Sequence, residues 1–186
     1  MTSTLTVDTI QGSTNADNVK LPKGCIVQVE QTFYDTVTTT FASTDGDVTL
    51  FSVNITPKFV TSKILVTIDI NVSHIDAYSA LIRCKRDNTY IGGGQLFASN
   101  YNNQFTNVWF NIRTASANAT YANSLTPCSQ SFLDSPATTS QLTYTVMARQ
   151  SGAANKAGRI NNPVDFGNYA YSSPAASTIT VMEIAQ

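Results

Sequence analysis

Charged side chains are scarce in this sequence of 186 residues. Eleven Lys and Arg stand against twelve Asp and Glu, which together make up 12% of the chain and leave a net charge of −1. Binding to nucleic-acid phosphates normally rests on clustered Lys and Arg. The composition therefore predicts that nucleic acid is not a partner.

Long hydrophobic segments are also missing. No run of about 18 apolar residues occurs that could cross a bilayer as a helix. The stretch Met1–Ile10 has neither the basic region nor the apolar region of a secretory signal. We expect a protein that does not insert into a membrane and that carries no secretion signal.

Residues suited to catalysis or metal binding are few. His74 is the only histidine, and the three cysteines, Cys25, Cys84 and Cys128, are odd in number and widely separated. This spacing fits neither a disulfide framework nor a zinc site, so we expect buried free thiols. A Cys25–His74 or Cys128–His74 pair stays open, since such pairs are spatial. We expect no enzyme activity, no cofactor and no metal.

The charged residues that are present have structural explanations. Most acidic residues lie in turn sequences, such as Asp47, Asp87 and Asp134, and glycoside hydrolysis needs two carboxylates that face each other across a groove. Arg83 and Arg86, with Lys85 between them, flank a predicted hairpin and fall on both faces of a strand. A solvated hairpin tip explains them better than a phosphate-binding patch does.

What the sequence has in abundance is Thr, Ser and Asn, with 26, 18 and 16 copies. Val, Ile and aromatic residues alternate with them, a pattern typical of strands with one wet face. The clearest predicted strand is Ser62–Val72. One further strand is predicted to begin at Cys25, and the others cover 48–55, 79–86, 89–98, 106–113, 140–148 and 177–185. The fold class is predicted to be all-β, a jelly-roll-like antiparallel β-sandwich with a detached N-terminal arm strand.

Four local features refine this prediction. A phase change around Phe51 indicates a bulge, and Asp87-Asn88 predicts a tight hairpin turn. Gly92–Gly94 lacks the spacing of a nucleotide-binding loop and indicates a bulge or a close approach of another backbone. In the first main strand, alternation places Val29 with Cys25 and Val27 on one face, and Ile26, Gln28 and Glu30 on the other.

The N-terminal segment is predicted to be an arm. Leu5, Val7 and Ile10 lie in a short Thr-rich strand, and a polar linker that contains Pro22 and Gly24 separates this strand from the rest. The linker is longer than an ordinary loop. We therefore divide the chain into an assembly arm and linker, 1–24, and a single β-sandwich domain, 25–186.

Asn and Tyr side chains gather in two long predicted loops. Aromatic rings stack on sugars and amides bind hydroxyl groups, so these loops are candidates for receptor contact, although Asn and Tyr are also ordinary loop residues. The candidates are Tyr101, Asn102, Asn103, Phe105, Tyr169 and Tyr171.

Four segments together carry a family resemblance: Thr4–Gln11, Val19–Val29, Ile55–Val66 and Ser177–Ile184. They resemble small virion structural proteins of tailed bacteriophages, most of all the tail-fibre-like proteins of marine phages. The resemblance covers both ends and the first third of the chain. It implies a homotrimeric β-sandwich that docks onto other virion proteins, of the tail or the capsid, through its N-terminal arm.

The function that this resemblance implies is structural. A virion protein, assembled in the host cytoplasm, would serve as a tail-fibre or adhesin component and would display its loops to a glycan or protein on the host surface. The alternative is a capsid decoration or cement protein that stabilises the phage head. The sequence alone does not separate a tail location from a capsid location.

Overall fold

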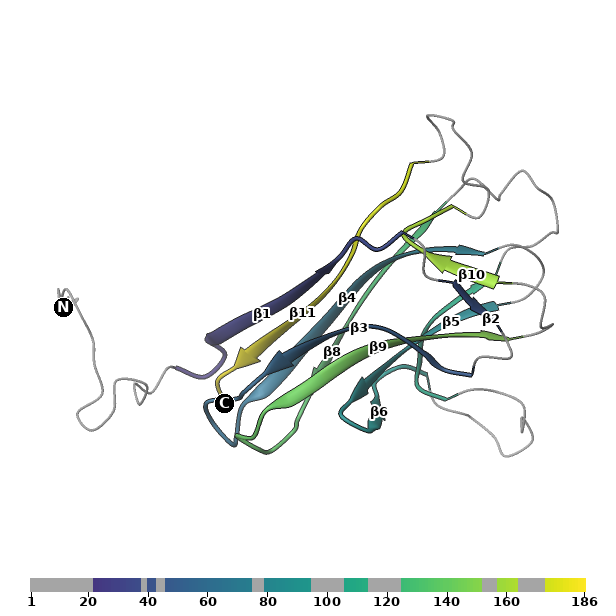
Figure 1. The fold of residues 1–186 in the computed structure, drawn as a ribbon. Coiled ribbons are helices and arrows are strands. Elements are labelled where there is room, and N and C mark those ends of the chain that lie inside the picture. The colour runs from purple at the N-terminus through teal and green to yellow at the C-terminus, as the bar shows by residue number, and fades with distance from the viewer. Residues whose placement is uncertain are drawn as a thin grey trace.

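Two antiparallel sheets stack face to face and form a sandwich (Figure 1). The structure is a computed structural model, and it describes residues 22–37, 40–42, 46–74, 79–94, 106–113, 125–151, 157–163 and 173–186. Within these ranges every regular element is a strand. No helix that could cross a membrane occurs among them.

Sheet A is built around its longest strand, β4. Along one side of β4, β11 pairs with its first half and β10 with its last residues. Strand β8 pairs along the opposite side of β4. Strand β1 extends the sheet beyond β11, and β2 extends it beyond β10. The strands are β1 (Ile26–Tyr34), β2 (Thr40–Ala42), β4 (Lys63–His74), β8 (Thr126–Asp134), β10 (Ala157–Ile160) and β11 (Ser177–Ile184).

Sheet B has β9 and β5 at its centre. Strand β3 pairs with β9 at one edge, and β6 and β7 pair with successive parts of β5 at the other edge. The strands are β3 (Val48–Ile55), β5 (Ser79–Arg86), β6 (Thr89–Ile91), β7 (Val108–Arg113) and β9 (Leu142–Ser151).

The strand order is that of a jelly roll, which confirms the predicted fold class. With the short strands β2 and β10 set aside and β6 and β7 taken as one edge, sheet A runs β1-β11-β4-β8 and sheet B runs β3-β9-β5-β7. Consecutive long strands therefore alternate between the sheets at both ends of the chain, as the paired Greek keys of a jelly roll require.

Alternation builds the core between the sheets, as the sequence predicts. Ile64, Val66, Ile68, Ile70 and Val72 of β4 all point inward, and none of them is more than 1% exposed. The fully buried rings of Tyr144 and Phe41 lie in the same cluster. Burying side chains of this size contributes about 1.5–3 kcal/mol each, so this row is a principal source of the stability of the sandwich.

Three strands, β2, β8 and β10, were not predicted from the sequence. Strand β8 lies at an edge and is mostly polar: Cys128 and Phe132 pack against the core, and Leu133 lies on the outer face. Strands β2 and β10 have three and four residues, too few to show a period.

The two faces of strand β1 differ from those that the sequence predicted. A bulge shifts the register between Ile26 and Gln28, so Val29 lies opposite Met182 on the outer face. Gln28 and Thr32 point inward to β3, where their side chains donate hydrogen bonds to the carbonyl oxygens of Thr56 and Ser52. Val29 is therefore 49% exposed instead of buried.

The predicted bulge at Phe51 and the Asp87-Asn88 turn are both confirmed. The register of β3 against β9 shifts between Thr49 and Phe51. Asp87 adopts a positive φ of 51°, and β5 and β6 flank this turn. The bulged position Trp109 of β7 is buried, and its indole Nε1 donates a hydrogen bond to the Ile91 carbonyl.

Gly93 explains the glycine run, because a second backbone approaches it closely, as predicted. Its φ is +69°, and a Cβ atom at this position would lie 2.6 Å from the carbonyl carbon of Asn107. Its neighbour Gly94 has nothing within 4 Å of the same ideal position. The chain therefore tolerates no side chain at Gly93 and has room for one at Gly94.

We expect Gly93→Ala to lower the free energy of unfolding by about 1–3 kcal/mol, because it adds left-handed strain and a backbone clash. Gly94→Ala is the matched control and should change it by less than about 1 kcal/mol. Thermal or urea unfolding followed by the fluorescence of Trp109 measures both. Equal stability of the two variants would contradict the close approach.

Candidate assembly surface

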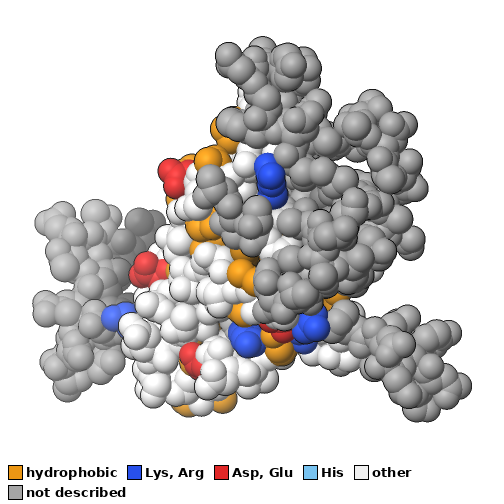
Figure 2. Space-filling view, turned by 45° about the vertical axis from the view of Figure 1, so that its right-hand side comes forward, with side chains coloured by type: hydrophobic (Ala, Val, Ile, Leu, Met, Phe, Trp, Pro, Cys, Tyr) orange, Lys and Arg blue, Asp and Glu red, His pale blue; other side chains and the backbone are white. Residues whose placement is uncertain are grey.

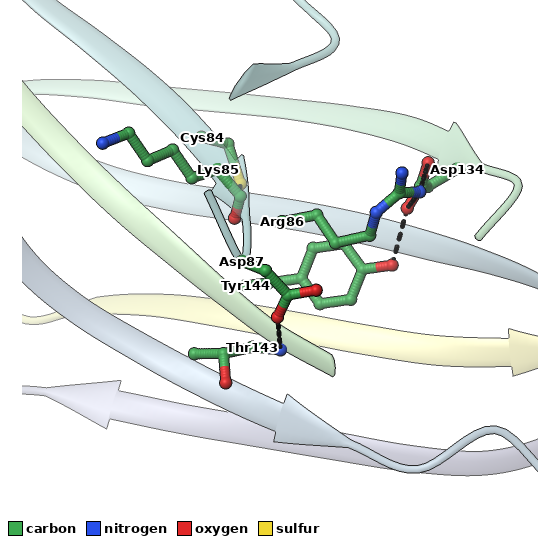
Figure 3. A network of polar contacts seen from close by, with 7 residues as sticks. All are labelled: Cys84, Lys85, Arg86, Asp87, Asp134, Thr143 and Tyr144. Atoms are coloured by element: carbon green, nitrogen blue, oxygen red, sulfur yellow. Dashed lines mark hydrogen bonds and ion pairs between the residues drawn. The ribbon is translucent and has the colours of Figure 1, made fainter. Parts of the chain in front are cut away.

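One buried polar cluster joins the two sheets of the sandwich. Asp134, at the end of β8, receives hydrogen bonds from Arg86 of β5 and from the hydroxyl of Tyr144 in β9, each at 2.7 Å (Figure 3). Its side chain is 8% exposed and that of Arg86 is 25% exposed. Asp134 is therefore an inter-sheet link and not the turn residue that the sequence suggested.

A second cluster corrects the expected role of Arg83. Its guanidinium lies 2.6 Å from Asp47 and stacks 3.5 Å from the ring centre of Tyr90, whose hydroxyl also donates to Asp47. Arg83 is only 8% exposed, so it is not part of a solvated hairpin tip. Pairing with Asp47 and the aromatic face offsets the cost of burying this charge.

Glu183 is fully buried and ties the connection between β3 and β4 to sheet A. One carboxylate oxygen accepts hydrogen bonds from the backbone N–H groups of Lys58 and Phe59, and the other accepts one from the Gln28 amide. Three donors satisfy the charge, as burial of a carboxylate requires. The residue orders this end of the sandwich.

These buried groups are poorly suited to catalysis. Burial, together with the nearby Asp134 carboxylate, raises the pKa of the Cys84 thiol to about 12. Burial and the hydrogen bond to Asp134 also raise the pKa of Tyr144 well above its usual range. Both groups stay protonated near neutral pH, whereas a nucleophile needs the opposite shift. All three thiols were expected to be buried. Cys84 is buried, whereas Cys25 and Cys128 are partly exposed.

The feature that invites binding is an apolar row on the outer face of sheet A. The paired positions of four adjacent strands place Val29, Met182, Leu65 and Leu133 side by side. Val29 is 49% exposed and Leu133 is 45% exposed, at the two ends of the row. We call these four residues the apolar row.

Strand β1 carries two further exposed apolar side chains on this face, one beside the row and one separated from it by Gln31. Ile26, opposite Ile184, is 54% exposed, and Phe33 is 64% exposed. The next positions across the sheet are polar: Gln31 donates to Thr180 at 2.8 Å. Apolar residues exposed singly are normal, but a contiguous line of them across a sheet is typical of a contact surface.

Charge contributes little to the part of the surface that the structure describes. In Figure 2 blue and red side chains are few on the described part of the visible face, with one small mixed group of both colours near its lower edge. The described residues contain no group of three or more His, Cys, Asp or Glu side chains arranged to hold a metal ion. Shape and apolar contact are therefore better grounds for binding here than electrostatic attraction.

The residues that the sequence proposed as sites lie outside the described residues. This applies to the arm residues Leu5, Val7 and Ile10, and to the receptor candidates Tyr101, Asn102, Asn103, Phe105, Tyr169 and Tyr171. The first receptor segment follows Gly94, which bridges to β7 at the edge of sheet B, and the second follows Pro163 after β10 of sheet A. Both roles stay predictions.

The apolar row was missed by the sequence analysis, although part of its signal was present. Leu65 is an apolar residue on the otherwise polar face of the strictly alternating strand β4, and Met182 occupies the same phase in β11. What the sequence could not supply is the register that aligns these residues with Val29 and Leu133.

Comparisons with known proteins concern the fold alone. No protein-family model matches the sequence, and no curated protein matches it. Among solved structures, a mutant VP2 protein of infectious bursal disease virus in derived T=1 particles overlaps with a TM-score of 0.44 at 12% identity, over 86% of this chain and 37% of that chain. The T13 particle of the same virus gives a TM-score of 0.41 at 12% identity, over 85% and 36%.

The chain therefore spans little more than a third of the length of these viral chains. Identities this low describe architecture and not activity. The jelly-roll order stated above rests on the pairing of the strands themselves.

The raised pKa of Cys84 predicts a pH dependence of stability. In the unfolded chain the thiol loses its proton near pH 9.0, while in the folded chain it keeps it to about pH 12. The folded state thus binds more protons in this window, and stability should fall as the pH rises from 9 to 12, by at most about 1.4 kcal/mol per unit. Urea unfolding at pH 8, 9 and 10 measures this slope.

Cys84→Ala is the control for this prediction. Removing the thiol should flatten the slope above pH 9, even though the cavity lowers stability at every pH. An unchanged slope in the variant would mean that other groups cause the loss.

Proposed function

We propose that this chain is a non-enzymatic structural protein of a bacteriophage particle, in which it packs against neighbouring subunits through sheet A and its N-terminal arm. The apolar row is the observation that carries the proposal. Val29 and Leu133 are exposed and Met182 and Leu65 between them are partly exposed, so the row is costly in water and gains from being covered. The resemblance of the sequence to phage virion proteins suggests that this assembly is a phage particle.

The ends of the sandwich support this proposal. Pro22, where the described chain begins, lies near β1, and Gly24 donates a hydrogen bond to Ala185 just beyond β11. The end of the linker, 22–24, therefore joins the sandwich beside Ile26 and Ile184, next to the apolar row. The connections between β4 and β5, β9 and β10, and β10 and β11 begin at the opposite end of the sheets.

This geometry favours the capsid over the tail. A decoration or cement subunit stabilises a shell by lateral contacts. A sheet face that neighbours cover, with the linker of the arm joining the sandwich beside it, suits this role. A homotrimer, implied by the sequence resemblance, would suit the threefold positions of such a shell. The subunit would reside in the virion after assembly in the host cytoplasm.

The tail-fibre or adhesin reading is the second candidate. It is supported by the Asn- and Tyr-rich loop sequences, whose side chains suit contact with a host glycan or protein. Both candidates have a sandwich anchored through its arm, and they differ in whether these loops contact a receptor. They also differ in where the protein sits on the particle.

Antibody labelling of intact particles separates the two candidates. We expect label over the head, because lateral packing through a sheet face suits a shell. Label confined to the tail would contradict the capsid proposal and favour the fibre.

A double variant, Tyr101→Ala with Tyr169→Ala, tests the receptor role directly. A decoration protein predicts unchanged adsorption of the particles to host cells, since these rings would contact no receptor. A fall in adsorption of tenfold or more, with particle yield unchanged, would instead establish the adhesin role, because a few aromatic anchors carry most of the affinity in such surfaces.

A further inference from the structure

We propose that the segment Thr4–Gln11 of a neighbouring copy adds as a strand to the free edge of β1 and so extends sheet A. This inference rests on the proposed function and names the partner and site of the arm. The partner is a second copy of this chain, and the site is the line of β1 that faces away from β11.

The edge of β1 is open and poorly protected. Among the described residues, β1 pairs only with β11, so its other side offers a row of backbone N–H and C=O groups. Proteins usually protect such edges with charge, proline or short length. Strand β1 has nine residues, no proline and a single charge, Glu30.

The side chains of β1 also lack cover. Ile26, Val29 and Phe33 are 54%, 49% and 64% exposed, and they belong to the five large apolar side chains that are most exposed among the described residues. An edge with open backbone groups and exposed apolar side chains is the site where an extended segment binds by strand addition. The backbone supplies affinity, and the alternate side chains supply specificity.

The first half of the arm sequence matches the two faces of β1. A strand through Leu5 and Val7 places both on one side and Thr4 and Thr6 on the other, and Ile10 falls on the threonine side. Beside β1, the apolar side would continue the apolar row next to Val29. The threonine side would lie along the polar inner side chains of β1, such as those of Gln28 and Thr32, which already bind β3.

The start of the described chain favours a neighbour over the same copy. A turn at Pro22–Cys25, closed by the hydrogen bond from Cys25 N to Pro22 O and formed with Gly24 at φ +88°, takes the chain off the line of β1. Figure 1 shows the purple segment before β1 leading away from the two sheets. Residues 12–21 span at most about 35 Å, which is enough to reach an adjoining sandwich.

Disulfide trapping between two chains tests this docking. Cys25→Ser and Cys128→Ser remove the partly exposed thiols, and the buried Cys84 stays. One chain then carries Leu5→Cys and the other Val29→Cys, and the two full-length chains are produced together and mildly oxidised. Val7→Cys replaces Leu5→Cys in a second pairing, since either residue can lie opposite Val29.

The expected product is a covalent dimer of twice 20.1 kDa in at least one pairing, lost on reduction. The matched control replaces Val29→Cys by Asp69→Cys, an exposed outer-face position in the central strand β4, and should give at least tenfold less dimer. Unchanged fluorescence of the buried Trp109 verifies that each variant is folded.

Two results would overturn the proposal. No interchain product with either arm variant, or as much with the Asp69→Cys control, places the arm elsewhere. A disulfide that forms only when Leu5→Cys or Val7→Cys and Val29→Cys share one chain places it on its own β1. Neither result affects the location of the protein on the particle, so the docking site can fail while the structural function stands.

Discussion

The register of β4 is the constraint on which sheet A depends. This strand pairs with β11 and β10 along one side and with β8 along the other. The pairing that buries Val66 beside Val181 is the same pairing that aligns Leu65 with Met182 and Leu133 on the outside. A slip of one residue would exchange the faces of a strand and would both expose the core and break the apolar row. Folding and the proposed assembly therefore rely on one set of backbone pairings.

Five charged side chains of the described part of the chain hold the fold together. Asp134 links sheet A to Arg86 and Tyr144 of sheet B, and Asp47 holds Arg83 inside sheet B. Glu183 fixes the connection between the sheets through backbone donors. This use of charge fixes the geometry of the sandwich, and under the proposed function it leaves apolar contact and backbone edges as the means of binding other subunits.

The sequence predicted those parts of the fold where one face of a strand is regular. The alternation of β4, the bulge near Phe51 and the glycine run all follow from local chemistry. It failed where pairing overrides the local pattern: β8 is polar because it lies at an edge, and the β1 bulge turns Val29 outward. The apolar row is assembled from four distant segments, so only the register could reveal it.

The central claim is that the outer face of sheet A is covered in the assembled particle. Carbene footprinting read by mass spectrometry measures it most directly, with particles compared against the dissociated chain. The account predicts that labelling of Leu65, Leu133 and Met182 falls several-fold on assembly, while the exposed Ser52 and Asn54 of β3 change little. Equal labelling of the apolar row in both states would contradict it.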